Sequence, residues 1–249
     1  MKSVFTNIKR SYTLISIVIL YALTYAEPVK QDSARAVRAL ALVNFYSLNP
    51  DVRIEINPVT GVPEDIWGDI SRYQNETDPV EAAYEFFEQN KDLYGIRQLK
   101  EELRLDGVVK DEIGTTVFLK QYYKGIEVQY GRVPVHFNRS GKLMGVNGGF
   151  AQIFDLSTKP SIDSLSAIRI VKRDLKYTAE DESRAAEAQK ALGTNRLPVN
   201  AVLVIASYEN CYHLVWIIDL FRSRPYESWV YSVDAHTGVI LGKGSALLD

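Results

Sequence analysis

The residues of this chain best suited to catalysis are its three histidines, His136, His213 and His236. A hydrolytic zinc helix needs two histidines four residues apart to bind the metal, and a glutamate after the first to activate water. The three histidines are followed by FNRS, LVWI and TGVI, so none has a second histidine in reach. We expect no metal and no cofactor, with His136 and His213 on the more polar faces of strands and His236 in a turn. A site built from ligands distant in sequence is the alternative.

The cysteine and the acidic clusters offer no reaction either. Cys211 is the only cysteine, so the chain forms no intramolecular disulfide and its cores must hold by packing. No motif places a base beside this thiol, and we expect a small buried residue within a strand. Glu101-Glu102 and Glu180–Glu182 stand in polar contexts that favour a solvated face over an acid–base pair. We therefore assign no catalytic residue and predict that the protein is not an enzyme.

Tyrosines are the remaining candidates, and the chemistry they suit is contact with a partner. Tyr122, Tyr123 and Tyr130 cluster around Lys124-Gly125, which is a turn signal. A turn projects side chains beyond a sheet, and tyrosine gives a large contact area at modest entropic cost. The cluster predicts a partner-binding patch; ordinary packing within a sheet is the alternative.

Strands must position this cluster. Between Thr115 and Phe150 three apolar runs are separated by turn signals at Lys124-Gly125, Arg139–Gly141 and Gly148-Gly149. In the middle run Val133, Val135 and Phe137 alternate with Arg132, Pro134 and His136. This period of two predicts a half-buried strand within an antiparallel meander.

A helix just upstream is expected to cover the apolar face of that sheet. Asp78 suits its cap, Pro79 its first position and Glu81 its first turn. Apolar residues then recur at helical spacing, namely Val80, Ala83, Tyr84 and Phe87. Gly95 is a plausible end. We predict that Val133, Val135 and Phe137 face Val80, Tyr84 and Phe87.

The segment before this helix, residues 27–77, reads as a lead and a hairpin. Residues 27–45 are a polar lead into a short helical stretch with a loose period, carried by Ala34, Val37, Ala41 and Val43. Residues 51–68 predict two short strands around a turn, because Val52, Ile54 and Ile56 alternate with charged residues before Thr60-Gly61.

A second unit of the same kind follows a linker at 151–160. Asp163 suits a helix cap, and an apolar stripe follows at Ala167, Ile168, Val171 and Leu175. Residues 178–193 suit an exposed helix with a thin stripe of Ala185, Ala188 and Leu192. Four strand-like runs lie at 201–207, 211–221, 228–234 and 238–243, the last two joined by a turn at Asp234 and Thr237-Gly238. The fold class is thus α+β, with two helix-on-antiparallel-sheet units.

The first 26 residues predict an export signal. Lys2, Lys9 and Arg10 precede an apolar core from Thr13 to Thr24, and Thr24–Ala26 suits cleavage before Glu27. The apolar run is short for a membrane span, so a membrane is a partner only if the signal stays uncleaved. Cleavage removes three positive charges from a chain whose net charge is −2, which argues against nucleic acid as a partner. We expect a secreted or extracytoplasmic protein.

At its central residues the chain resembles the fungalysin/thermolysin propeptide domain of secreted zinc metallopeptidases. The resemblance lies in QYYKGIEVQYGRVPVHFN (121–138), in FFEQNKDLYGI (86–96) before it and in SGKLMGV (140–146) after it. It implies a propeptide-like domain over 78–155. The chain departs from the pattern at Glu127, where proline is usual, and at Tyr130, where glycine is common. Because both flank the turn, we place the partner-binding residues at Tyr122, Tyr123, Gly125, Glu127 and Tyr130.

Residues 160–243 resemble a PepSY domain, which follows the first domain in the pro-regions of the same peptidases. The resemblance rests on Ala167-Ile168, on Leu214–Trp216, and on WVYSVDA (229–235) followed by TGVI (237–240). The charged insert at 178–193 exceeds the usual pattern.

These resemblances imply a pro-region without its catalytic part, since the sequence stops at Asp249. The expected function is to bind a thermolysin-like secreted zinc metallopeptidase and to inhibit it, or assist its folding, in trans. One alternative is an N-terminal fragment of a peptidase whose catalytic domain is missing. Another is an exported structural or sensory module unrelated to proteases, because fold alone does not fix function.

Overall fold

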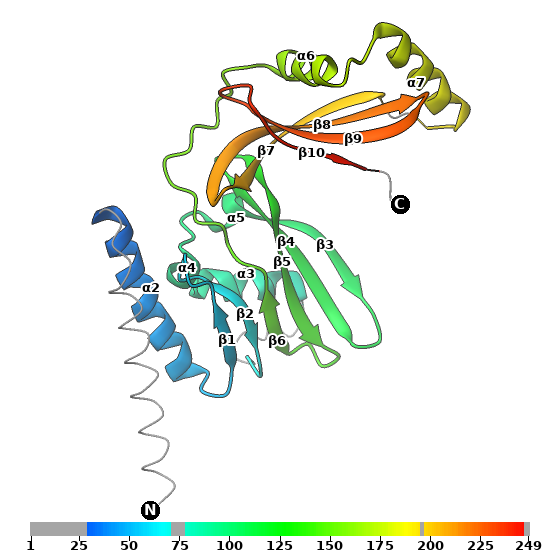
Figure 1. Ribbon diagram of the computed structural model, residues 1–249. Helices are drawn as coiled ribbons and strands as arrows, with labels where there is room; N and C mark the ends of the chain where they lie inside the picture. Colours follow the sequence, from blue (N-terminus) through cyan, green and yellow to red (C-terminus); the bar gives the residue numbers. More distant parts are fainter. Residues whose placement is uncertain (1–28, 71–77, 195–196, 247–249) are drawn as a thin grey trace, which may run out of the picture. The chain divides into compact units, whose positions relative to one another are not determined.

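The computed structural model describes residues 29–70, 78–194 and 197–246 (Figure 1). The predicted signal peptide and its cleavage site lie outside these residues. The fold is α+β, as expected, and it divides into two compact units. The first comprises residues up to 122 together with 131–152, and the second comprises 123–130 together with 153–249.

The sheet of the first unit is antiparallel, in the order β1-β2-β6-β5-β4-β3. Its strands are β1 (Arg53–Ile56), β2 (Pro63–Trp67), β3 (Leu103–Lys110), β4 (Gly114–Tyr123), β5 (Ile126–Asn138) and β6 (Leu143–Asn147). The predicted hairpin at 51–68 is confirmed as β1 and β2, and the predicted meander as β4, β5 and β6.

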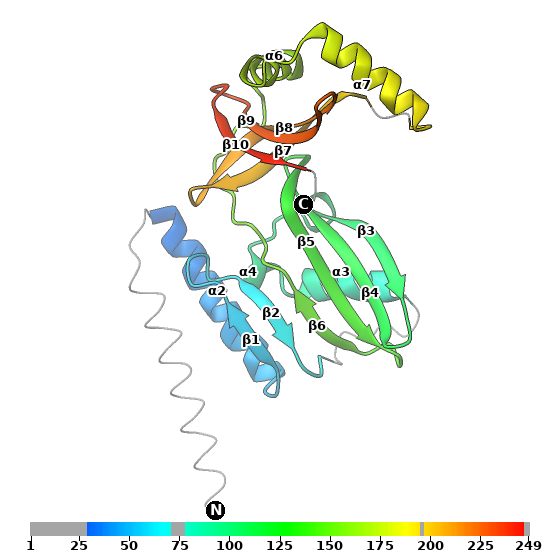
Figure 2. The ribbon, with the colours of Figure 1, turned by 45° about the vertical axis from the view of Figure 1, so that its right-hand side comes forward.

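Helices cover one face of this sheet (Figures 1 and 2). They are α2 (Val29–Leu48), α3 (Pro79–Gln89), α4 (Lys91–Tyr94) and α5 (Leu99–Glu102). The predicted start of α3 is confirmed, because Asp78 is the N-cap and its carboxylate accepts a hydrogen bond from the Val80 N–H at 2.8 Å. Gly95 does not end this helix. α3 stops at Gln89, and Gly95, with φ +72°, closes the separate short helix α4.

The core of the first unit joins these helices to the strands. Val133, Val135 and Phe137 are buried in one cluster with Phe87, and Val80 and Tyr84 pack against that cluster. The two predicted sets therefore belong to one core. The stripe expected on α2 was wrong in part, because Leu42 and Phe45 carry its buried face while Val37 is 48% exposed.

The second unit is a four-stranded antiparallel meander in the order β7-β8-β9-β10. Its strands are β7 (Val199–Tyr208), β8 (Cys211–Ser223), β9 (Tyr226–Asp234) and β10 (Ile240–Ser245), and its helices are α6 (Ser164–Asp174) and α7 (Ala179–Ala191). Within this unit Val128 also pairs in parallel with Ile205.

The helices of the second unit are capped much as the sequence predicts. Asp163 accepts from the Ser166 N–H at 2.7 Å, and Ala167 and Val171 of α6 are buried against Ile218 and Leu220 of β8. α7 contributes one buried residue, Ala185, and Leu192 is 68% exposed. Cys211 is exposed rather than buried, because it is the first residue of β8, beside the hairpin turn.

Candidate partner-binding site

The hairpin between β4 and β5 has a two-residue turn that matches the twist of its strands. Lys124 and Gly125 both adopt positive φ angles, +47° and +84°. This is the pattern of a type I′ turn, which the right-handed twist of a hairpin favours. The Lys124 ammonium donates a hydrogen bond to the Leu156 carbonyl at 3.3 Å. Lys124 and Gly125 are both exposed at the tip.

Tyr122 and Tyr123, at the end of β4, are half-buried and each lies under a cation. The guanidinium of Arg104 is 4.2 Å from the ring centroid of Tyr122, and the Lys124 ammonium is 4.9 Å from that of Tyr123. Because neighbouring strand residues point to opposite faces, the two rings do not share a face. No sequence signal indicated the contact between Arg104 and Tyr122, because it depends on the register of β3 against β4.

Tyr130 is the most conspicuous side chain of the hairpin. It is 93% exposed, and its φ of +60° puts a bulky residue in the left-handed region. That conformation costs roughly 1–2 kcal/mol for a residue other than glycine. Packing within the described chain does not offset the cost, because so little of the ring is covered. A strained, exposed aromatic residue is a reason to look for function.

Glu127 and Gly125 complete the expected residues. Glu127 is half-buried on β5, next to the buried Val128. A Cβ built on Gly125 would have no heavy atom within 4 Å, so a side chain would fit there. Only the φ of +84° restricts substitution at this position. Whether these residues touch a partner stays a prediction.

The structure adds an aromatic and polar row that the sequence did not reveal. Trp67 stacks on His136, with ring centroids 5.3 Å apart, and the His136 Nδ1 lies 3.1 Å from the Thr116 hydroxyl. Asn147 donates to Asp65 on the same side of the sheet. Burial lowers the pKa of His136, and a hydrogen bond with Asn147 opposes that shift. Burial thus favours the neutral form of His136, whose ring is packed against Trp67.

His213 and Asp234 form a pair in the second unit that could be mistaken for a catalytic dyad. Their Nδ1 and carboxylate oxygen are 2.9 Å apart. The same carboxylate also accepts from the N–H groups of His236 and Thr237 and from the Thr237 hydroxyl. Burial raises the pKa of Asp234, but these hydrogen bonds outweigh burial and bring it to about 2. Asp234 therefore closes the predicted β9–β10 turn and also holds His213 of β8, and the expected turn position of His236 is confirmed.

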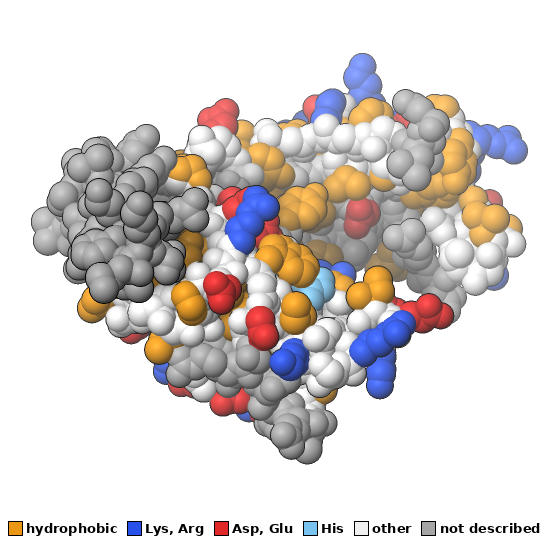
Figure 3. All heavy atoms as spheres, turned by 90° about the horizontal axis from the view of Figure 1, so that it is seen from below, with side chains coloured by type: hydrophobic (Ala, Val, Ile, Leu, Met, Phe, Trp, Pro, Cys, Tyr) orange, Lys and Arg blue, Asp and Glu red, His pale blue; other side chains and the backbone are white. Residues whose placement is uncertain are grey.

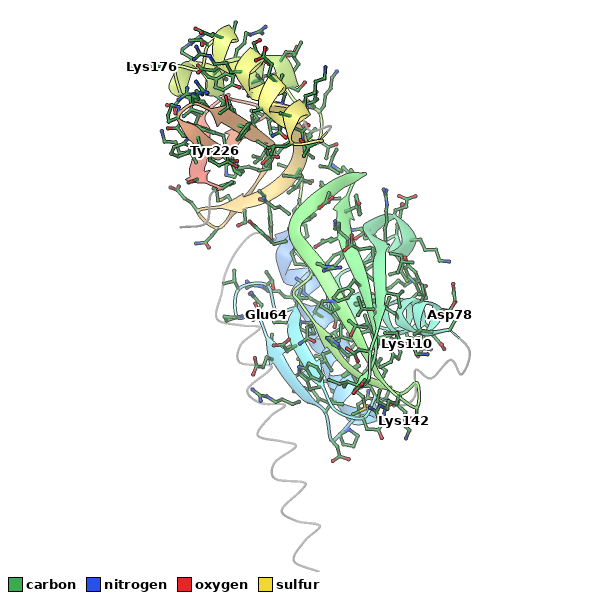
Figure 4. All side chains as sticks on the ribbon, turned by 90° about the vertical axis from the view of Figure 1, so that its right-hand side faces the viewer. Glu64, Asp78, Lys110, Lys142, Lys176 and Tyr226 are labelled. Carbon is green, nitrogen blue, oxygen red and sulfur yellow. The ribbon has the colours of Figure 1, made fainter. Side chains whose placement is uncertain are left out.

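The remaining surface of the described chain is mixed in character. The face in Figure 3 carries basic, acidic and hydrophobic side chains side by side, without a continuous basic patch. A cavity of about 340 Å³ in the first unit is lined by Asp78, Lys110 and the β5–β6 turn. Figure 4 labels Asp78 and Lys110. Among the described residues no group of three His, Cys, Asp or Glu side chains could hold a metal ion. Nor does any described helix have the length and apolarity to cross a membrane.

The comparisons with known proteins point to the same segment as the resemblance. Residues 101–150, from the end of α5 through β3–β6, match the Fungalysin/Thermolysin Propeptide Motif. Thermolysin from Alicyclobacillus acidocaldarius subsp. acidocaldarius is 31% identical over 179 residues, which cover 70% of this chain and 31% of that protein. Bacillolysin from Bacillus caldolyticus is 28% identical over 168 residues, covering 66% of this chain and 29% of that one. The chain thus corresponds to about a third of the length of these relatives.

A solved structure, the Bacillus megaterium YpeB C-terminal domain, aligns with 86% of this chain and 97% of its own, at a TM-score of 0.36 and 13% identity. A likeness at that level supports no conclusion about function. The propeptide resemblance of the first domain is therefore confirmed over 101–150. The PepSY resemblance of residues 160–243 stays a prediction.

Proposed function

We propose that this protein is an exported, non-catalytic pro-region that binds a thermolysin-like zinc metallopeptidase in trans. The observation that carries the proposal is the match of residues 101–150 to the Fungalysin/Thermolysin Propeptide Motif. The similarity to thermolysin extends well beyond that motif, over 179 residues. The same similarity supports secretion as part of the proposal, and the basic and apolar start of the sequence supports cleavage before Glu27.

The binding residues we propose are those of the β4–β5 hairpin. Tyr130 carries the strongest argument, because contact with a partner would offset a strain that the isolated chain leaves uncompensated. Tyr122 and Tyr123 add aromatic area that cations already hold in place. Fixed rings lose little conformational entropy on binding. Gly125 forms the turn with its positive φ, and Glu127 follows it on β5.

Binding would act on the peptidase in one of two ways. A pro-region that covers the substrate cleft of the folded peptidase inhibits it. A pro-region that binds the native state in preference to the unfolded state also favours folding, since any such ligand shifts the equilibrium by mass action. The two effects share one interface, so the hairpin residues are expected to matter for both.

The experiment is an inhibition assay with residues 27–249 and mature thermolysin. We expect saturable loss of peptide hydrolysis at a ratio near one to one. A refolding assay on unfolded thermolysin, with and without the protein, separates folding assistance from inhibition. Val202→Ala, at a position 47% exposed in the second unit, is a control for the hairpin variants. Absence of both inhibition and folding assistance, over several thermolysin-like peptidases, would refute the proposal.

A further inference from the structure

The outer edge of β3 is an open strand edge in the first unit. β3 pairs with β4 on one side only, and no other described strand pairs with it. It forms the outermost strand of that sheet in both ribbon views (Figures 1 and 2). Alternate backbone N–H and C=O groups along an edge strand have no partner in the sheet, and they form a template for another strand.

The side chains of this edge are apolar but exposed. Leu105 is 49% exposed, Val108 46% and Val109 53%. Soluble proteins usually protect such an edge with charges, proline or a bulge. Here the bulge between Leu105 and Gly107 protects only the first half. From Gly107 to Lys110 the pairing with β4 continues without a break, so this half of the edge is regular and unprotected.

The one acidic side chain of the strand is turned to the sheet. The Asp106 carboxylate lies 3.1 Å from the Lys120 ammonium and 2.8 Å from the Arg132 guanidinium, on β4 and β5. Its charge is thus compensated within the unit. The hydrogen bond from Lys120 is the largest cause of a lowered pKa of Asp106. The positive charges of Lys120 and Arg132 and the hydrogen bond from Arg132 lower it further. Asp106 therefore does not repel an approaching strand.

Two cations mark the ends of the open edge. Neither Arg104 nor Lys110 has an ion-pair partner among the described residues, and Arg104 lies over the Tyr122 ring. Six residue steps separate them in the sequence, but the bulge takes up one of these steps, because their partners on β4, Lys120 and Thr115, are five apart. The span is therefore roughly 17 Å along the strand. An incoming strand of about seven residues would therefore meet a positive charge near each end and valine side chains between.

We propose that β3 binds an extended, apolar segment with an acidic residue at each end, which adds to the sheet as a further strand. Backbone hydrogen bonds supply affinity in this mode, and the flanking charges supply selectivity. A second copy of β3 fits less well, because it brings the same two uncompensated cations and no spare acid. The inference deepens the proposed function. It rests on that function only in naming an exposed segment of the peptidase as the source of the added strand.

Two fluorescent heptapeptides test the inference without any peptidase. One is Glu-Val-Thr-Val-Thr-Val-Glu and the other is Lys-Val-Thr-Val-Thr-Val-Lys. With residues 27–249 we expect the acidic peptide to bind about tenfold more tightly than the basic one, and added salt to reduce the difference. Amide resonances that shift in NMR spectra should lie on β3 and its neighbour β4.

Three variants make the result decisive. Val109→Lys should abolish binding, whereas Val239→Lys, at a valine 56% exposed in the second unit, should leave it unchanged. Lys110→Glu should weaken binding of the acidic peptide and strengthen binding of the basic peptide. Equal affinities, shifts elsewhere, or self-association that Val109→Lys removes would each overturn the inference. Because no peptidase is present, these outcomes are independent of the inhibition assay that tests the proposed function.

Discussion

Trp67 on β2 reaches across β6 to stack on His136 of β5, with the two ring planes 19° apart. Gly145, the residue of β6 that pairs with both of them, makes this possible. A Cβ on Gly145 would lie 2.5 Å from the Trp67 ring, closer than real contacts allow. The stack therefore depends on a glycine between two rings, and it sets the environment of the histidine.

His136 should titrate below its ordinary pKa of 6.5, because burial disfavours its charged form. A folded-state pKa below the unfolded one means that stability is full above about pH 6.5 and falls as the pH drops through the folded-state pKa. NMR titration of the imidazole checks the direction. Trp67→Ala exposes the ring and should raise the pKa. A pKa above 6.5 in the parent protein would contradict the burial of this side chain.

Asp234 should make the second unit sensitive to acid. Its pKa of about 2, against 3.8 for the free group, corresponds to about 2 kcal/mol of stability at neutral pH. Because the folded-state pKa is the lower one, that contribution is present above about pH 4 and is lost as the pH falls toward 2. Urea unfolding of Asp234→Asn should differ from the parent protein at pH 6 and much less at pH 2. An equal difference at both pH values would show that the carboxylate charge is not the cause.

Phe137→Ala should destabilise the first unit by about 3–5 kcal/mol. The side chain is 4% exposed within the core cluster, so its removal loses burial and leaves a cavity. Ile113→Ala is the control, since Ile113 is 83% exposed and its loss should cost less than about 0.5 kcal/mol. Denaturant unfolding gives both values. If the two variants lose the same stability, Phe137 is not a core residue.

Tyr130→Gly should separate strain from binding. Glycine adopts positive φ readily, so the variant should be as stable as the parent protein or more stable, by up to about 1 kcal/mol. The same change removes the exposed ring and should weaken inhibition of a thermolysin-like peptidase by about 1–2 kcal/mol. Tyr130→Ala loses the ring but keeps the strain, so it should bind like the glycine variant and be less stable. A destabilised glycine variant would mean that the ring packs in the fold.

Much of the architecture follows from local signals in the sequence. The Asp78-Pro79 pair starts α3 because the cap and the proline satisfy the free N–H groups of a first turn. The alternation of Val133, Val135 and Phe137 places β5 because a strand with one covered face needs that period. Tyr130 occupies a position where the propeptide pattern commonly has glycine. The positive φ of Tyr130 gives the physical reason for that glycine.

The features that the sequence did not predict depend on strand register and on where individual helices and strands begin and end. Trp67 and His136 meet only because β2, β6 and β5 align at Gly145. Gly95 closes α4 instead of α3 because the chain leaves the helix at Asn90, whose N–H bonds back to Phe86 and Phe87, and then re-enters a short turn. Cys211 lies exposed because β8 begins at that residue, a boundary that composition does not locate.

Direct binding tests the central claim. Residues 27–249 should be titrated into mature thermolysin in a calorimeter. A second titration uses thermolysin whose active site is blocked by a small inhibitor. We expect a complex with one pro-region-like chain per peptidase and a Kd of about 1 μM or tighter, weakened about tenfold by Tyr130→Gly. No detectable heat and no complex on gel filtration, with thermolysin and with bacillolysin, would contradict the claim that this chain is a pro-region that acts in trans.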